Sequence, residues 1–171
     1  IDASLRRLLV ILEKHFASAS YLLSKRPSSS DFALYGQLSQ LVNFDPTPRE
    51  ICHEVSLRTV AWVGLIEDQS GIEVTDEQWG SIESLPSTVK DLLIEIGNGY
   101  VPAQLANAKA IENGDKEWET EIDNCLWKQK SFPYQAKCLK WVNEEYSALE
   151  KNDRKKVNNL LDGTGCERLI L

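Results

Sequence analysis

The sequence predicts a mainly α-helical protein with one small β hairpin near residues 117–132. Apolar residues recur at intervals of three and four through most of the chain, which is the period of a helix with one buried face. Between residues 117 and 122, apolar and acidic residues alternate instead, as in a half-exposed strand. With 171 residues, the chain has the length of a single domain that buries its own core, and we expect one domain over residues 1–171.

The first predicted elements are two helices. An apolar face indicates an amphipathic helix over residues 3–18, and it is formed by Leu5, Leu8, Leu9, Leu12 and Phe16. A second helix is predicted after Pro27, because Ser28 can cap its first free amides and Asp31 can reach back to the Ser28 amide. We interpret Ser28 and Asp31 as a structural capping box. A catalytic pair is less consistent with the sequence, since no histidine lies near them to complete a triad.

The middle of the chain predicts three more helices, each bounded by proline or glycine. One opens at Thr47 or Pro48 and ends near Ser70, one follows Pro86 and ends at Gly97 or Gly99, and one opens at Pro102 and ends at Asn113-Gly114. Proline suits a first helical turn, and glycine commonly follows a last one. The polar, acidic residues 68–80 predict a connecting loop between the first two of these helices.

The last third of the chain predicts a hairpin followed by two helices. Trp118, Thr120 and Ile122 define the inward face of the first strand, and Asp123-Asn124 is a turn dipeptide. Residues 126–132 can return as the second strand. Because an isolated two-stranded hairpin is only marginally stable, we expect this one to lie on the helices. Helical periodicity resumes after Pro133 and again over residues 152–161, where Asp162-Gly163 provides a stop.

Composition and charge exclude several classes of protein. Hydrophobic residues make up 42% of the chain and charged residues 26%, which excludes a wholly disordered protein. No apolar run approaches the roughly 18 residues that a membrane helix needs, so we expect no membrane partner. The formal net charge is −7, which argues against nucleic acid as a partner, since phosphates are bound by basic surfaces.

The cysteines and histidines predict neither a disulfide framework nor a metal site. The four cysteines stand at positions 52, 125, 138 and 166 without a CxxC pair, and there are only two histidines. Cys138 fits a small buried hydrophobe, whereas Cys166, in a glycine-rich tail, is the better candidate for a reactive thiol. The lack of a disulfide pattern and of a signal peptide predicts a cytoplasmic protein. The sequence contains no methionine, which favours a piece of a longer chain.

Residues 21–38 resemble the α-helical C-terminal domain of glutathione S-transferases. Ser28 and Asp31 match the capping box that this family carries at the start of a central buried helix, although Ser30 stands where alanine is commoner. The run around Trp62 is similar to the helix that follows in the family. Residues 132–141 and 162–167 look like the tail of a poorly characterised bacterial-type branch. The resemblance therefore divides the chain into a core motif region, about residues 1–67, and a branch-specific extension over residues 68–171.

This resemblance implies a glutathione S-transferase C-terminal-like helical bundle that holds half an active site. In the family, an N-terminal thioredoxin-like domain binds glutathione and supplies the catalytic residue, and this chain contains no such domain. The resemblance thus implies no catalytic residue here, no tightly bound cofactor, and glutathione as a co-substrate only together with the missing domain. That domain, a hydrophobic small molecule and a second copy of the chain in a homodimer are the partners it suggests. The alternative is a non-catalytic helical module that keeps the fold for protein–protein interaction.

Four residues are candidates for lining a hydrophobic pocket, namely Tyr35, Tyr100, Asn107 and Trp141. Amphipathic aromatic residues line ligand pockets because they combine a large apolar area with one directed hydrogen bond, but they also fill helical cores. Asn107 lies in an otherwise apolar run and is the hardest of the four to explain as core. A buried amide needs partners, so Asn107 either ties its helix to a loop or faces a ligand.

Overall fold

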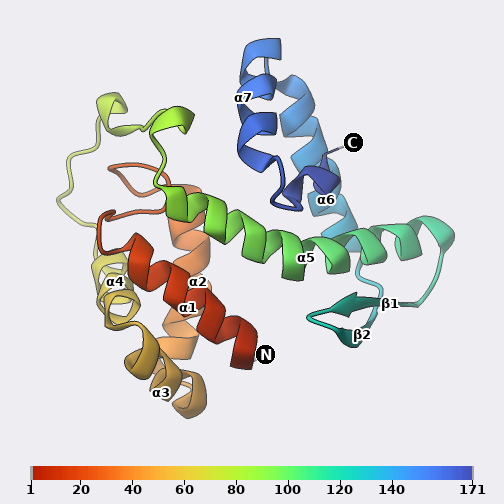
Figure 1. Cartoon of the computed structure of the whole chain (residues 1–171), viewed down its shortest axis with the longest axis horizontal. Coiled ribbons are helices and arrows are strands. Elements are labelled where there is room, and N and C mark those ends of the chain that lie inside the picture. The colour runs from red at the N-terminus through yellow and green to blue at the C-terminus, as the bar shows by residue number, and fades with distance from the viewer. Residues whose placement is uncertain (1, 171) are drawn as a thin grey trace. The chain divides into compact units, whose positions relative to one another are not determined.

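The computed structural model describes residues 2–170 and is mainly helical, with one small antiparallel sheet (Figure 1). The described residues form helices and strands in the following order: α1 (Asp2–His15), α2 (Ser29–Asn43), α3 (Pro46–Val55), α4 (Leu57–Glu67), α5 (Ser87–Asn113), β1 (Glu117–Ile122), β2 (Cys125–Lys130), α6 (Pro133–Ala148) and α7 (Lys151–Leu161). Short 3₁₀ turns cover Asp76–Gln78, Ile82–Ser84 and Cys166–Leu169. No helix of the described residues is long and apolar enough to cross a membrane.

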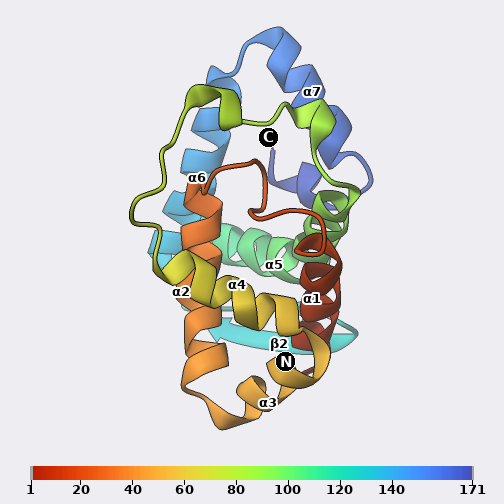
Figure 2. The ribbon, with the colours of Figure 1, turned by 90° about the vertical axis from the view of Figure 1, so that its left-hand side faces the viewer.

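The chain divides into two compact units, and α5 begins in one and ends in the other. The first unit extends to Leu92 and the second begins at Leu93. In the first unit, α1 and α2 each contact both α3 and α4, and Figure 2 shows α4 crossing α1 and α2. Its core consists of buried residues from all four helices and from the loop after α1, namely Leu9, Leu12, Tyr21, Leu38, Val42, Ile51, Cys52, Trp62, Val63 and Ile66.

The start of α2 contains the capping box expected from the sequence. The Asp31 carboxylate accepts hydrogen bonds from the backbone amide and the hydroxyl of Ser28, at 2.9 and 2.6 Å, and from the backbone amide of Leu22, at 2.8 Å. Asp31 is fully buried. Its carboxylate therefore caps α2 and also fixes the loop that joins α1 to α2.

The single helix predicted from Thr47 or Pro48 to Ser70 is wrong, because the structure has two helices there. α3 ends at Val55, and Ser56 is the N-cap of α4, accepting a hydrogen bond from the amide of Thr59 on its side-chain oxygen at 3.2 Å. The Ser56 hydroxyl also donates to Glu13 of α1 at 2.9 Å. Serine at an N-cap competes with the continuous helix for backbone amides, and the contact with α1 favours the break.

The two helices predicted after Pro86 and from Pro102 are one helix of 27 residues, α5. Gly97 is not a helix end. It lies inside α5 where the Thr164 backbone approaches so closely that a β-carbon at position 97 would stand 1.9 Å from the Thr164 carbonyl oxygen. Pro102 also lies within α5. The glycine is thus explained by packing in the second unit.

The predicted hairpin is present. β1 and β2 pair antiparallel with Glu117 opposite Lys130 and Ile122 opposite Cys125. Asp123 and Asn124 have positive φ angles of 53° and 58°, as both central residues of a type I′ turn require. Trp118 is buried, whereas every residue of β2 is exposed. Trp118 is therefore the residue of the hairpin that contributes to the core of the second unit.

Candidate functional site

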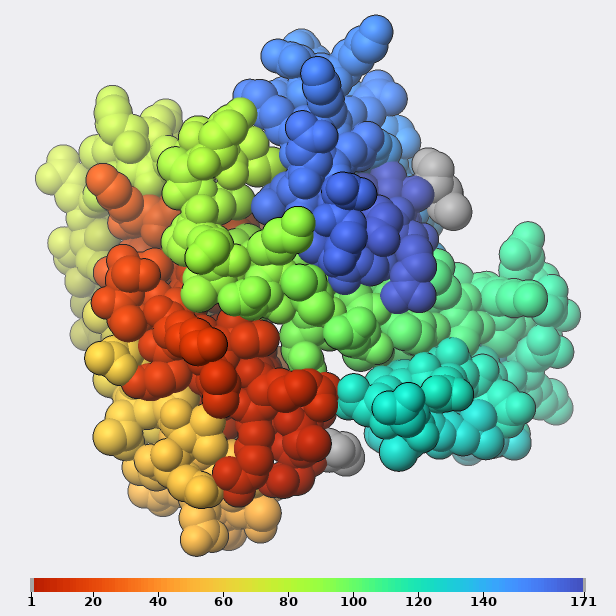
Figure 3. Space-filling view, viewed as in Figure 1, coloured from red at the N-terminus to blue at the C-terminus, as the bar shows by residue number. Residues whose placement is uncertain are grey.

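Two loops of the first unit meet and enclose a hollow. One loop joins α1 to α2 and the other joins α4 to α5, and in Figure 3 their red-orange and yellow-green surfaces lie side by side. The backbone amide of Lys25 donates to the carbonyl of Gln78 at 3.1 Å. A β-carbon on Gly80 would lie 3.3 Å from the carbonyl oxygen of Leu23, so the two backbones are close there as well. Residues far apart in sequence thus form one surface.

The hollow between these loops has a volume of about 580 Å³, within the range of about 300–1,000 Å³ that is typical of small-molecule sites. Its lining combines apolar side chains with hydroxyl, amide and charged groups, and consists of Ser18, Ala19, Ser20, Tyr21, Leu23, Ser24, Lys25, Glu77, Gln78, Trp79, Gly80, Ser81, Ser84 and Pro86. A molecule with an apolar part and hydrogen-bonding groups would find both an apolar wall and polar partners here.

His15 holds the first of these loops against the start of α5. The ring is fully buried, with Nδ1 2.7 Å from the hydroxyl oxygen of Thr88 and Nε2 3.0 Å from the carbonyl oxygen of Tyr21. Because a carbonyl can only accept, Nε2 carries the hydrogen and Nδ1 accepts from Thr88 in the neutral ring. The indole nitrogen of Trp62 donates to the carbonyl of Ser20 at 3.0 Å. The backbone of the first loop is therefore held in place at Ser20 and Tyr21, two residues that line the hollow.

Arg26, on the first loop, contacts two residues of the second loop, Thr75 and Trp79. Its guanidinium carbon lies 4.5 Å from the centre of the Trp79 ring, and its Nη1 donates to the carbonyl of Thr75 at 3.3 Å. A cation over an indole face is attracted by the electron density of the ring. Trp79 remains 48% exposed. The contact thus positions Trp79 and leaves about half of its surface accessible.

The structure distributes the four predicted pocket residues over both units. Tyr35 lies on α2, half-buried against the core of the first unit. Tyr100 and Asn107 lie on α5 and Trp141 on α6, all in the second unit. Tyr100 and Trp141 are 48% and 42% exposed, and burial raises the pKa of the Tyr100 hydroxyl. None of the four lines the hollow between the two loops.

Asn107 ties its helix to a loop, which was one of the two roles expected for it. The fully buried amide donates through Nδ2 to the Phe132 carbonyl at 3.0 Å and accepts at Oδ1 from the Phe132 amide at 2.7 Å. One turn earlier in α5, Gln104 donates to the carbonyl of Gln135 at 2.6 Å. These bonds fasten the start of α6 to α5.

The fastened segment presents a row of exposed aromatic rings. The rings of Phe132 and Tyr134 are 6.2 Å apart, and that of Trp141 lies 6.0 Å from Tyr134 in an edge-to-face arrangement. The Lys137 ammonium lies 4.9 Å from the centre of the Trp141 ring. All three rings are at least 42% exposed. They form an aromatic surface of α6 that is available to a partner of the second unit.

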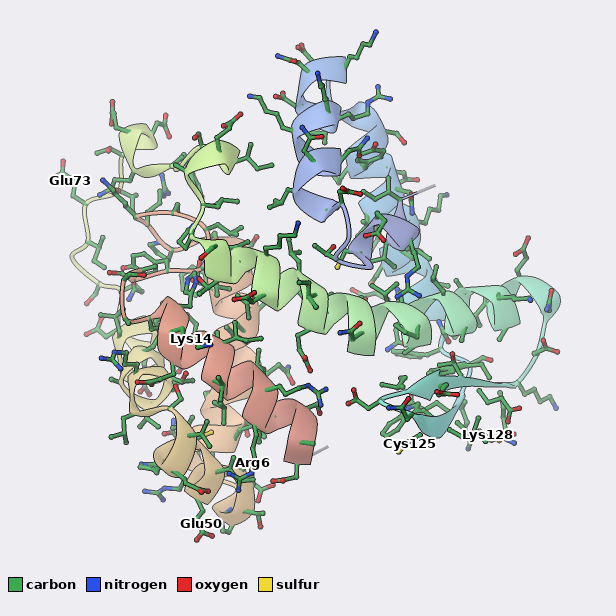
Figure 4. All side chains as sticks on the ribbon, viewed as in Figure 1. Arg6, Lys14, Glu50, Glu73, Cys125 and Lys128 are labelled. Atoms are coloured by element: carbon green, nitrogen blue, oxygen red, sulfur yellow. The ribbon has the colours of Figure 1, made fainter. Side chains whose placement is uncertain are left out.

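Cys166 is not the accessible thiol that its glycine-rich surroundings suggested. It is buried, and its sulfur lies 3.1 Å from the carbonyl oxygen of Leu93. Burial raises the pKa of the Cys166 thiol, and burial likewise raises that of Cys52. Since the thiolate is the reactive form, both cysteines are poor nucleophiles. Cys125, at the hairpin turn labelled in Figure 4, is exposed.

We expect thiol labelling of the folded protein to distinguish these cysteines. A thiol reagent at neutral pH should modify Cys125 first, whereas Cys52 and Cys166 should react only after unfolding, because their thiols are buried and held protonated. Mass spectrometry of digests taken over time gives the order. The variant Cys125→Ser should lose the fast phase. A fast phase at Cys166 in that variant would show that the tail is not packed as described.

The described residues contain no group of three or more His, Cys, Asp or Glu side chains that could hold a metal ion. Comparison of the chain with protein-family models, curated proteins and solved structures finds no match. The hollow between the loops was missed by sequence reasoning, which assigned residues 68–80 only to a connecting loop. The signals in the sequence were the serines of residues 18–24 and the run Trp79-Gly80-Ser81.

Proposed function

We propose that this chain is the C-terminal helical domain of a glutathione S-transferase-like protein of the cytoplasm. In this proposal it supplies a hydrophobic pocket for the electrophilic second substrate. A thioredoxin-like domain outside this chain binds glutathione and provides the catalytic group. A second copy of the chain, in a homodimer, is a further proposed partner. The free cysteines are consistent with a reducing compartment.

The observation that carries the proposal is the capping box of α2. The residues that resemble the family, Ser28 and Asp31, form reciprocal contacts at the start of a helix whose Leu38 and Val42 are buried. Burying a carboxylate without hydrogen-bond donors would be strongly unfavourable. The three donors around the Asp31 carboxylate therefore form a specific local arrangement. This arrangement lies within residues 21–38, which resemble the glutathione S-transferase C-terminal domain.

The small-molecule part of the proposal is supported by the hollow between the loops. Tyr21, Leu23 and Trp79 give it an apolar wall. Tyr35 in the first unit and Tyr100, Asn107 and Trp141 in the second stay predicted as residues that contact a ligand. In the second unit, Asn107 directs both of its polar atoms to Phe132, so Tyr100 and Trp141 are the stronger candidates there for contact with a ligand.

We expect this chain alone not to conjugate glutathione. The glutathione thiol must be ionised by a positioned donor, and the proposal places that donor in the thioredoxin-like domain. Conjugation of an activated aryl chloride, measured at high protein concentration, should equal the rate without protein. Joining the chain to a glutathione-binding thioredoxin-like domain should produce turnover. A rate above background that disappears on changing one residue of this chain would overturn the assignment.

A non-catalytic interaction module is the alternative, and the exposed aromatic surface of Phe132, Tyr134 and Trp141 favours it. Aromatic residues are enriched at the centres of protein interfaces. The coding sequence upstream of Ile1 distinguishes the two functions. A thioredoxin-like segment there supports the transferase, whereas a start codon directly before Ile1 supports the module.

A further inference from the structure

The turn between α6 and α7 carries a basic surface hollow of about 730 Å³. It is lined by Tyr146, Lys151, Arg154, Lys155, Asn158 and Asn159. Three of these residues are cationic, the others carry hydroxyl or amide groups, and none is acidic. Residues 124–171 hold nine basic and six acidic residues, a net charge of +3 in a chain of net charge −7. The basic hollow is thus a positive site on an acidic protein.

The three cations that line the hollow do not serve to pack α7 against the rest of the unit. The helix contributes no buried residue. Arg154 and Lys155 lie three and four residues after Lys151, so each is a neighbour of Lys151 on the helix surface. Positive charges near the N-terminus of a helix oppose its dipole, and like charges at this spacing repel each other. The arrangement is unfavourable for the helix alone and becomes favourable when an anion occupies the hollow.

Two hydrogen bonds hold donors of the basic hollow in place. Arg154 donates through Nε to the Leu149 carbonyl at 2.8 Å, which directs the rest of its guanidinium away from that carbonyl. The Tyr146 hydroxyl donates to Oδ1 of Asn158 at 2.7 Å, which leaves the Asn158 amide nitrogen as a donor. Two acidic residues, Glu150 and Asp153, are sequence neighbours of the lining cations, and neither lines the hollow. The Asp153 carboxylate lies 3.6 Å from the Lys156 ammonium.

We propose that the basic hollow binds the phosphate group of a small molecule. Arginine presents a planar fork of donors that fits two phosphate oxygens, and the lysines add point charges. A tetrahedral phosphate offers more acceptor directions than a planar carboxylate and therefore suits a hollow lined by several donors. The inference concerns α6 and α7 only and does not depend on the transferase proposal.

The test is an amide chemical-shift titration of the full chain with inorganic phosphate and then pyrophosphate, at constant ionic strength set with sodium chloride. Saturable shifts should be confined to residues 146–159. Pyrophosphate should bind about tenfold more tightly, because a second phosphate adds charge-assisted hydrogen bonds. Shifts spread over basic residues throughout the chain, or equal shifts with chloride alone, would overturn the proposal.

Matched variants separate a specific site from general charge. Lys151→Gln/Lys155→Gln should weaken phosphate binding about tenfold or more, since two charged donors are lost. Arg154→Lys keeps the charge but loses the fork, and should weaken binding less. Lys109→Gln/Lys140→Gln removes the same charge outside the hollow and should leave binding unchanged. An equal loss of phosphate binding in both double variants would refute the site. A second refuting result would be that poly-glutamate shifts the amide signals of residues 146–159 and phosphate does not. The hollow would then bind an acidic protein surface.

Discussion

Replacing Asp31 with alanine should lower the free energy of unfolding by about 3 kcal/mol, because a lost helix cap and buried donors left without an acceptor add to each other. The variant removes the acceptor of the Ser28 and Leu22 amides inside the first unit. Chemical denaturation of wild type and variant gives the difference. Ser28→Ala should have a smaller effect of about 1 kcal/mol. The two changes should be non-additive, since the residues bond to each other.

Asp45 provides the matched control for this experiment. It is the N-cap of α3 and accepts from the Thr47 amide at 3.3 Å, but it is exposed. Asp45→Ala should therefore cost only about 0.5–1 kcal/mol, since water can replace the lost acceptor. Equal effects at Asp31 and Asp45 would show that burial and the loop contact contribute nothing. Unfolding curves of Asp31→Ala that overlay the wild type would refute the capping assignment.

Replacing Gly97 with alanine should destabilise the second unit by about 3 kcal/mol, because overpacking against a rigid backbone cannot be relieved by a rotamer change. The new β-carbon would meet the carbonyl oxygen of Thr164 at 1.9 Å and the Cα of Gly165 at 3.0 Å. Thermal or denaturant unfolding gives the magnitude. Amide exchange should show increased opening of the Cys166–Leu169 turn, which follows the contact directly.

Gly99, in the same helix, is the matched control. A β-carbon there meets no atom within 4 Å beyond its chain neighbours and the backbone of its own helix. Gly99→Ala therefore adds only the helix propensity of alanine and should stabilise by about 0.5–1 kcal/mol. We therefore expect the free energy of unfolding to fall in Gly97→Ala and to rise in Gly99→Ala. Stabilisation by both substitutions would show that α5 and Thr164 are not in close contact.

The sequence predicted those elements whose signals are local. The hairpin follows from alternation and from a dipeptide that tolerates positive φ, and the start of α2 follows from Ser28 and Asp31. The break at Ser56 was missed, and the helix end predicted at Gly97 or Gly99 is absent, for a shared reason. Each depends on a partner distant in the sequence, Glu13 for Ser56 and Thr164 for Gly97, and one sequence does not reveal which distant segments meet.

The same physical limit applies to the candidate site. Tyr100 and Trp141 were predicted to line a pocket, and in the structure they are 48% and 42% exposed. The hollow of the first unit instead depends on two polar loops, and their pairing through Lys25 and Gln78 has no periodic signature. Loops commonly carry binding groups on a rigid scaffold. A polar segment between two helices can therefore form part of a binding site as well as join the helices.

The small sheet has a consequence for self-association. Within residues 2–170 it contains two strands only, so each strand has one edge with backbone groups free to pair with a strand of another molecule. β2 adds exposed Leu126 to such an edge, but it also carries Lys128 and Lys130. Charged lysines disfavour edge-to-edge pairing because it would desolvate them. The two lysine charges therefore oppose aggregation through this hairpin. Removing them would make pairing of β2 with a strand of another molecule more favourable.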